Sequence, residues 1–124
     1  MSEAPTLLVV DDDPAMRMIL NISLELFGYT ILVAGAGEEA VAIARDHAEI
    51  EVVILDVVMA GLSGKDLADQ LHALLPRASI LFCSGYPASV LQGYGIDISV
   101  ANFLQKPCRP PELQEKIEAL MAAR

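Results

Sequence analysis

LLVVDDDP, residues 7–14, joins four aliphatic residues directly to three carboxylates. An unbroken apolar run is typical of a strand that is buried on both faces of a parallel sheet. Aspartate, in contrast, is a poor strand former and is costly to bury without a partner. The three acids therefore either form a solvated turn, with Asp13 capping a helix that starts at Pro14, or serve a cation that offsets their mutual repulsion.

The pattern of an apolar strand followed by an amphipathic helix repeats along the chain. The predicted strands cover 7–10, 29–34, 52–56, 79–84 and 101–105, and the predicted helices cover 14–27, 38–47, 64–75, 88–94 and 111–121. The helix over 88–94 is expected to be marginal, because Gly93 and Gly95 lie at its end. Five such units predict an α/β fold with one doubly wound, five-stranded parallel sheet in the flavodoxin-like order 2-1-3-4-5.

Composition narrows the classes of protein that fit. The 124 residues, without a linker or repeat, predict a single domain over 1–124. A net charge of −9 argues against binding to nucleic acid or to an anionic membrane, and no apolar stretch is long enough for a membrane span. Two cysteines, Cys83 and Cys108, form neither a disulfide framework nor a zinc site, and the N-terminus lacks a signal pattern, so we expect a cytoplasmic protein. No exposed apolar stripe is expected, which favours a monomer.

Polar residues follow or end four of the predicted strands. They are Asp11 with Asp12, then Asp56, Ser84 and Lys106. Because the carboxyl ends of parallel strands meet at one edge of the sheet, we expect these side chains to lie close together. Clustered carboxylates need a cation, and Mg²⁺ takes carboxylate, water and phosphate oxygens. A carboxylate can also act as a nucleophile that forms an aspartyl phosphate, so the pattern predicts phosphoryl transfer.

These motifs resemble the receiver domain of two-component response regulators. VVDDDP (9–14), ILDVVMAGLSG (54–64), ILFCSGYP (80–87) and FLQKP (103–107) stand in the family's order and at its spacing. The segments MAGLSG, SGYP and FLQKP most resemble the corresponding segments of receivers that are associated with hybrid histidine kinases. The resemblance covers about 6–122 and implies a signalling protein rather than an enzyme, apart from its own phosphorylation and dephosphorylation.

The resemblance implies a role for each residue of the acidic edge. Asp56 matches the residue that accepts the phosphoryl group. Asp12 matches the direct ligand of Mg²⁺, and Asp11 matches the acid that holds the ion through water. Val58 matches the position whose backbone carbonyl also binds the ion.

Three further positions match the family's switch. Ser84 matches the hydroxyl residue that hydrogen-bonds the phosphoryl group, and Lys106 matches the lysine that pairs with it. Phe103 matches the aromatic residue that moves inward when Ser84 moves toward the phosphate. The resemblance also implies that the peptide between Lys106 and Pro107 is often cis.

Four positions depart from the family's usual residues. Ala60 replaces a usual proline, Ser63 replaces a frequent aspartate or asparagine, and Cys108 replaces a bulky apolar residue. Phe103 lacks the hydroxyl of the commoner tyrosine. No departure removes a chemical group that the reaction needs, so they bear on the lifetime of the phosphate and the size of the switch.

The expected protein is a single-domain response regulator, a receiver domain over 1–124 with its core at about 6–122 and no output domain. A histidine kinase or a histidine phosphotransfer protein is its expected donor, and phosphorylation switches a protein-binding surface over 88–112 toward an unidentified downstream target. Two alternatives are a receiver cut from a hybrid histidine kinase and a receiver-like interaction module that is never phosphorylated. A Mg²⁺-dependent phosphatase of the haloacid dehalogenase type is disfavoured, because Ala15 stands where such enzymes need threonine or valine and no cap insertion is present.

Overall fold

The computed structural model describes residues 4–57, 64–85, 93, 102–106 and 109–123. Its elements are β1 (Thr6–Val10), α1 (Pro14–Leu26), β2 (Thr30–Ala34), α2 (Gly37–Asp46), β3 (Ile50–Asp56), α3 (Gly64–Leu74), β4 (Ser79–Ser84), β5 (Asn102–Gln105) and α5 (Pro110–Ala122). The predicted bounds differ from these only at the ends of the elements, most at β3, which begins at Ile50 rather than Val52. The helix predicted over 88–94 falls outside the described residues, Gly93 excepted.

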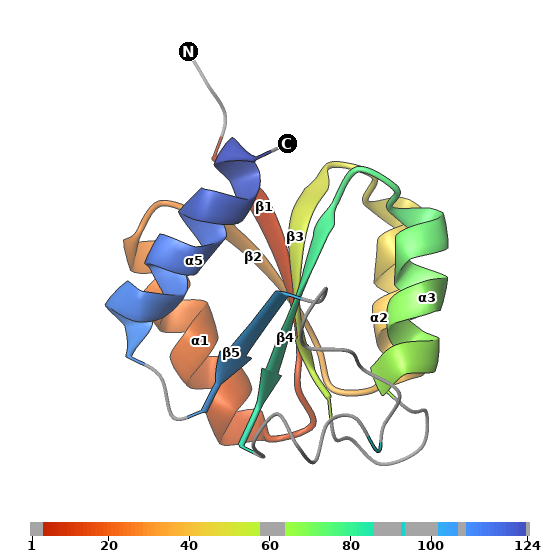
Figure 1. The fold of residues 1–124 in the computed structure, drawn as a ribbon, viewed down its shortest axis with the longest axis horizontal. Coiled ribbons are helices and arrows are strands. Elements are labelled where there is room, and N and C mark those ends of the chain that lie inside the picture. Colours follow the sequence, from red (N-terminus) through yellow and green to blue (C-terminus); the bar gives the residue numbers. More distant parts are fainter. Residues whose placement is uncertain (1–3, 58–63, 86–92, 94–101, 107–108, 124) are drawn as a thin grey trace.

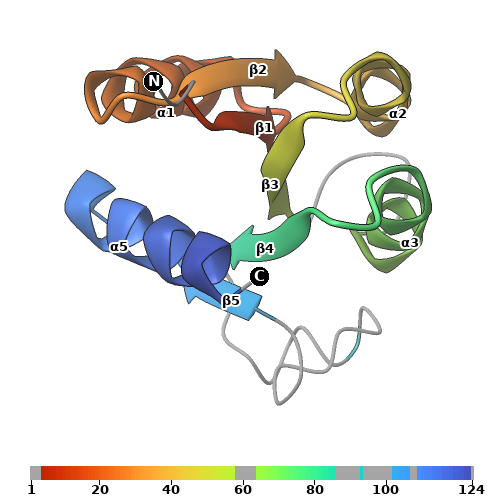
Figure 2. The same ribbon diagram turned by 90° about the horizontal axis from the view of Figure 1, so that it is seen from above.

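The strands form one parallel sheet in the order β2-β1-β3-β4-β5, as the sequence predicts. Figure 1 shows the strands crossing the molecule with all arrowheads toward one edge. Figure 2 looks onto the edge of the layers and shows α1 and α5 on one face of the sheet, with α2 and α3 on the other. The fold is therefore the predicted doubly wound α/β sheet, and the carboxyl ends of its strands share one edge.

The unbroken apolar run of β1 supplies two cores. Successive side chains of a strand point to opposite faces of its sheet. Leu8 and Val10 pack on the side of α2 and α3, whereas Leu7 and Val9 pack on the side of α1 and α5. All four side chains are fully buried, which explains why β1 has no polar alternation.

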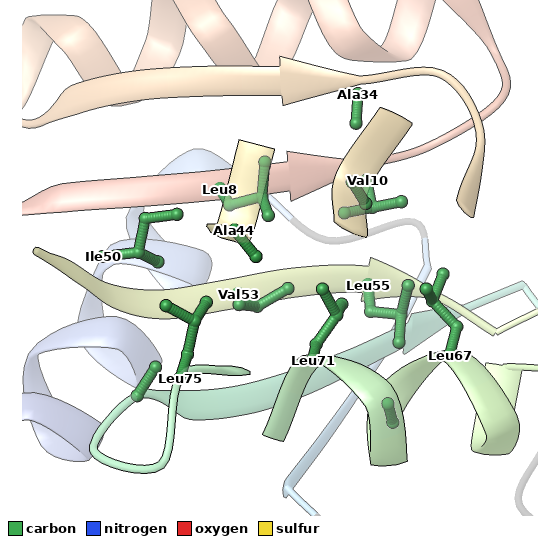
Figure 3. Packing of buried hydrophobic residues seen from close by; sticks show 13 residues of the cluster. Leu8, Val10, Ala34, Ala44, Ile50, Val53, Leu55, Leu67, Leu71 and Leu75 are labelled. Atoms are coloured by element: carbon green, nitrogen blue, oxygen red, sulfur yellow. The ribbon is translucent and has the colours of Figure 1, made fainter. Parts of the chain in front are cut away.

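The core beneath α2 and α3 is aliphatic, in keeping with the 5% aromatic content of the chain. Figure 3 shows Leu67 and Leu71 of α3 pointing toward Val53 and Leu55 of β3. Their spacing along α3 is one helical turn, which places both on the same face of the helix. This packing fixes β3, and with it the position of Asp56 at the end of that strand.

Local hydrogen bonds define both ends of α1. Asp13 Oδ1 accepts a hydrogen bond from the backbone N–H two residues on, at 3.0 Å, which confirms the predicted N-cap. At the other end Gly28 has a φ of 94°, a conformation that favours glycine. The backbone N–H of Gly28 donates to the carbonyl of Glu25, and that of Tyr29 donates to the carbonyl of Leu24. These two bonds form a Schellman motif, which stops the helix and turns the chain into β2.

The outward side of α1 contradicts the expectation that no apolar stripe is exposed. Met18, Ile19, Ile22 and Leu26 are exposed by 62, 54, 55 and 83%. Apolar residues cover more than half of the circumference of α1, and the sheet and α5 cover only one side of it. Despite this content, none of the helices in the described parts of the chain combines the length and the apolar character needed to cross a bilayer.

Candidate functional site

Four neighbouring strands bring polar side chains to one edge of the sheet. Asp11 directly follows β1, Asp56 ends β3, Ser84 ends β4 and Lys106 directly follows β5. Since β1, β3, β4 and β5 are adjacent in this order, residues from distant parts of the chain become neighbours. One carboxylate oxygen from each of Asp11, Asp12 and Asp56 lies within 4.8 Å of the other two. The edge therefore carries a compact acidic cluster beside an ammonium group and a hydroxyl group.

Both carboxylate oxygens of Asp11 accept a hydrogen bond. Its side chain is 3% exposed; Oδ1 accepts a hydrogen bond from the backbone N–H of Asp13 at 2.9 Å, and Oδ2 accepts one from Lys106 Nζ at 2.7 Å. The backbone N–H of Asp11 donates to the carbonyl of Ala34, the last residue of β2, at 3.1 Å. These bonds compensate the burial of a carboxylate that would otherwise be costly.

Arg17 supports this position and has no assigned role in the sequence prediction. Its Nη1 atom donates to the backbone carbonyl of Asp11 at 2.8 Å. A Cβ atom at Gly35 would lie 2.7 Å from the same Nη1 atom, so glycine leaves the space that the guanidinium fills. The signal for Arg17 in the sequence is a single basic residue one turn after the N-cap of a largely apolar helix.

Lys106 links the two ends of the cluster. Its Nζ atom lies 2.7 Å from Asp11 Oδ2 and 3.5 Å from Asp56 Oδ2. Burial acts to lower the pKa of Lys106, but the hydrogen bond to Asp11 and the charges of Asp56 and Asp11 outweigh it and raise the pKa. The stabilisation from this charge is therefore complete below the ordinary pKa of 10.5 and is lost as the pH rises through the higher pKa of the folded protein.

The donor set of the cluster fits a hard divalent cation. Three carboxylates face one ammonium group, so the cluster keeps an excess of negative charge. Both oxygens of Asp11 already accept hydrogen bonds, which favours contact through a water molecule. Asp12 is exposed at the rim and Asp56 is 14% exposed, so an ion can reach them from solvent. Oxygen ligands of this kind, few in number and open to water, are those that Mg²⁺ prefers.

Ser84 and Phe103 lie on the two strands beside the cluster. Ser84 is 1% exposed, and its backbone carbonyl accepts a hydrogen bond from the backbone N–H of Lys106 at 2.6 Å. This bond ties the end of β4 to the turn that carries the lysine. Phe103 is half-buried in β5 and lies in register with Phe82 of β4.

Several predicted positions lie outside the described residues. They are Val58, Ala60, Ser63, Pro107 and Cys108. Three expectations therefore stay predictions. They are the backbone ligand at Val58, the cis or trans state of the peptide before Pro107, and three of the four departures from the family pattern. Cys83, in contrast, is buried in β4 next to Ser84, in agreement with a packing role.

The comparison with protein families matches nearly the whole chain. The model of the response regulator receiver domain matches residues 7–118. Among curated proteins, the transcriptional regulatory protein AruR of Pseudomonas aeruginosa is 30% identical over 125 residues, which cover 98% of this chain and 51% of that protein. The chain spans about half the length of the curated relatives that it matches first.

Solved structures agree with the fold. The receiver domain of the hybrid histidine kinase CckA has a TM-score of 0.79 and 32% sequence identity, with 94% of this chain and 98% of that chain covered. A response regulator receiver domain protein from Methanospirillum hungatei has a TM-score of 0.86 over 98% of this chain and 96% of that one, at 24% identity. At that identity the second likeness supports the fold alone.

Proposed function

Because this chain belongs to the response regulator receiver domain family of two-component signalling, we propose that the carboxylate of Asp56 accepts a phosphoryl group from a histidine kinase or a histidine phosphotransfer protein. The observation that carries the proposal is the position of Lys106 Nζ, 3.5 Å from Asp56 Oδ2 and 2.7 Å from Asp11 Oδ2. A cation here can balance the charge of a phosphoryl group on Asp56. Phosphoryl transfer depends mainly on positioning and charge neutralisation, and the cluster supplies both.

The proposed reaction is a displacement at phosphorus. A carboxylate oxygen of Asp56 attacks the phosphorus atom of the donor's phosphohistidine, and the new P–O bond forms as the P–N bond breaks. The electron pair of the broken bond returns to the imidazole of the donor. Lys106 then pairs with one phosphoryl oxygen, and the hydroxyl of Ser84 donates a hydrogen bond to another.

We assign the metal site of this reaction to the same cluster. Asp12 and Asp56 would ligate Mg²⁺ directly, Asp11 would hold it through water, and the backbone carbonyl of Val58 would complete the protein ligands. Bound there, the ion supplies positive charge to the phosphoryl oxygens. The protein's own part is to keep the three carboxylates together in the absence of the ion, which the bonds from Lys106, Asp13 and Arg17 support.

The proposed output is a change of surface. Movement of Ser84 and Lys106 toward the phosphoryl group would shift the ends of β4 and β5 together, because the backbone N–H of Lys106 donates a hydrogen bond to the carbonyl of Ser84. Phe103, half-buried in β5, would then move inward as the two-state element of the switch. The organisation that we propose is a single-domain response regulator, with a receiver from a hybrid histidine kinase as the alternative.

Intact mass spectrometry after incubation with acetyl phosphate and Mg²⁺ tests the acceptor. Wild type should gain one phosphoryl group that is labile to acid and base, and Asp56→Asn should gain none. Asp46→Asn, at an exposed carboxylate that ends α2, is the matched control and should be modified like wild type.

Each other result contradicts a defined part of the proposal. An adduct that persists on Asp56→Asn would move the acceptor to the acids at 11–13. Absence of an adduct on wild type, also with phosphorylated histidine phosphotransfer proteins as donors, would favour the interaction module that is never phosphorylated. An adduct that forms equally well in excess EDTA would remove the metal from the reaction.

A further inference from the structure

A cavity lies between the sheet and the two helices α1 and α5, next to the acidic cluster. It has a volume of about 130 Å³, and residues of β1, α1, β3, β4 and α5 contribute to its lining. Protein interiors are close-packed, and they contain few voids larger than a water molecule. This cavity is therefore larger than close packing normally leaves, and the reaction proposed for Asp56 makes no use of its apolar part.

The inner part of the cavity is apolar. Val9 of β1, Ile54 of β3 and Cys83 of β4 line it from the sheet, and all three are buried in the core on the side of α1 and α5. Leu20 of α1 and Leu113 of α5 line it from the helices, which Figure 2 shows on this face of the sheet. Valine and cysteine are short, so they leave space below the helices. A ligand that fills this space must present an apolar body to it.

The cavity is accessible from the surface at α1. Ile19 belongs to its lining and is 54% exposed, whereas Val9 and Leu113 are 0 and 2% exposed. The cavity therefore extends from an exposed residue into the core. An engineered apolar cavity of about 150 Å³ in another protein stays dry and binds benzene. By this comparison, the present cavity accommodates one aromatic ring or a short branched aliphatic chain.

The end of the cavity at the edge of the sheet carries an excess of negative charge. Asp11, Asp56 and Lys106 line this end, so two carboxylates face one ammonium group. The ammonium group is already paired, because Nζ lies 2.7 Å from Asp11 Oδ2 and 3.5 Å from Asp56 Oδ2. Asp12 adds a third carboxylate to the same cluster. A ligand with an anionic head would be repelled here, whereas a cationic head would be attracted.

From the apolar wall and the acidic end we infer that the cavity binds a small amine, whose apolar body lies between α1 and α5 and whose ammonium group lies against the carboxylate of Asp56. Asp56 suits this contact because its side chain is 14% exposed. Asp11 is 3% exposed, and both of its oxygens already accept hydrogen bonds. The inference goes beyond the proposed function, since the amine binds without a phosphoryl group or a phosphodonor.

Three ligands that share one ring test the chemical class. Benzylamine carries a cation, benzyl alcohol is neutral and benzoate carries an anion. Amide chemical-shift titrations of the whole chain, at low salt and in EDTA, measure the three dissociation constants. Benzylamine should bind at least about fivefold more tightly than benzyl alcohol, benzoate should bind most weakly, and added salt should narrow the differences. Equal affinity for all three ligands, or tightest binding of benzoate, would overturn the inference.

The same titrations locate the site. The amide signals of Val9, Ile54 and Leu113 should be among those that shift most, because these residues line the apolar part. Leu20→Phe adds a ring to the lining and should weaken benzylamine binding at least about fivefold, since it occupies the space of the ligand. Leu74→Phe, at a half-buried leucine of α3 across the sheet, is the matched control and should bind like wild type.

Two results would overturn this location. One is unchanged binding to a Leu20→Phe variant whose amide spectrum shows that it is folded. The other is a wild-type titration in which benzylamine shifts only signals of residues away from the cavity, and this result decides the question even where Leu20→Phe does not fold.

A pair of charge variants tests the contact with Asp56. Asp56→Asn should lower the affinity for benzylamine to that for benzyl alcohol. Asp46→Asn removes the same charge from an exposed position at the end of α2 and should leave the affinity unchanged. Equal losses in both variants would mean general attraction to a chain of net charge −9 and would overturn the contact. Wild type that is phosphorylated on Asp56 but binds none of the three ligands would overturn this inference alone and leave the proposed function intact.

Discussion

The two halves of residues 7–14 show how differently adjacent parts of one chain are stabilised. Leu7–Val10 is fully buried, and its contribution to folding is the removal of apolar surface from water. Asp11–Asp13 begins one residue later, and there each acid has a different environment: Asp11 is buried and paired, Asp12 is exposed within a cluster, and Asp13 caps a helix. In the apolar half, any cavity left by a smaller side chain destabilises the fold. The acidic half, in contrast, combines stabilising and destabilising charges.

The largest effect is expected in the apolar half. Leu8→Ala should lower the free energy of unfolding by about 2–5 kcal/mol, because Leu8 is fully buried and its truncation leaves a cavity. Urea denaturation followed by circular dichroism measures this. Ile22→Ala, at an apolar residue that is 55% exposed, is the control and should change the free energy by less than about 1 kcal/mol. Similar losses in both variants would contradict the assignment of the core.

Asp11 should behave as a structural charge. Asp11→Ala is expected to cost about 2 kcal/mol of stability, since it leaves Lys106 without its closest partner and removes the acceptor for the N–H of Asp13. A double-mutant cycle with Lys106→Met measures the coupling. Additive losses in the cycle would show that the 2.7 Å contact contributes no interaction energy.

Asp13 should contribute through its hydrogen bond rather than its charge. Asp13→Ala is expected to cost about 1 kcal/mol, the usual value of an N-cap, and Asp13→Ser should retain most of that stability. Thermal unfolding of the three proteins separates the two contributions. If the serine variant were as unstable as the alanine variant, the charge of Asp13 would be what stabilises α1.

Asp12 should have the smallest effect, and in the opposite direction. Asp12→Asn removes one of three clustered carboxylates, so in EDTA it should raise the free energy of unfolding by about 0.5 kcal/mol. Millimolar Mg²⁺ should stabilise wild type and leave this variant nearly unchanged, because binding to the folded state alone shifts the unfolding equilibrium. Equal responses of the melting temperature to Mg²⁺ in both proteins would exclude Asp12 as a ligand.

The strands and their order could be predicted from sequence because each strand is an apolar run of a few residues between turns. The alternation of strand and helix then leaves few topologies, and the polar residues at the strand ends must share an edge. The pairing of Lys106 with Asp11, as well as Asp56, could not be predicted, since it depends on side-chain distances across the edge. Arg17 was missed for a similar reason: its partner is a backbone carbonyl, and a single basic residue in the first part of a helix does not indicate that contact.

The exposed side of α1 could not be predicted for a different reason. Helical spacing indicates which residues share a face, but it predicts that the opposite face is exposed without apolar residues only when that face is polar. In PAMRMILNISLEL, residues 14–26, the strongly polar residues Arg17, Asn21 and Glu25 occupy only one narrow side, so an apolar residue elsewhere on the helix can be either buried or exposed. Position in the fold, with the sheet on one side and α5 beside it, is what leaves Ile22 and Leu26 uncovered.

The contact between Lys106 and Asp11 also has a consequence for the order in which the protein matures. It joins residues separated by 95 positions, and Lys106 follows the last strand of the sheet to be synthesised. While β5 is still inside the ribosome, the first three strands can already pair, but their acids lack the lysine. The proposed acceptor site is therefore completed last, and a truncated or nascent chain carries the carboxylates without the cation that we propose balances the phosphoryl charge.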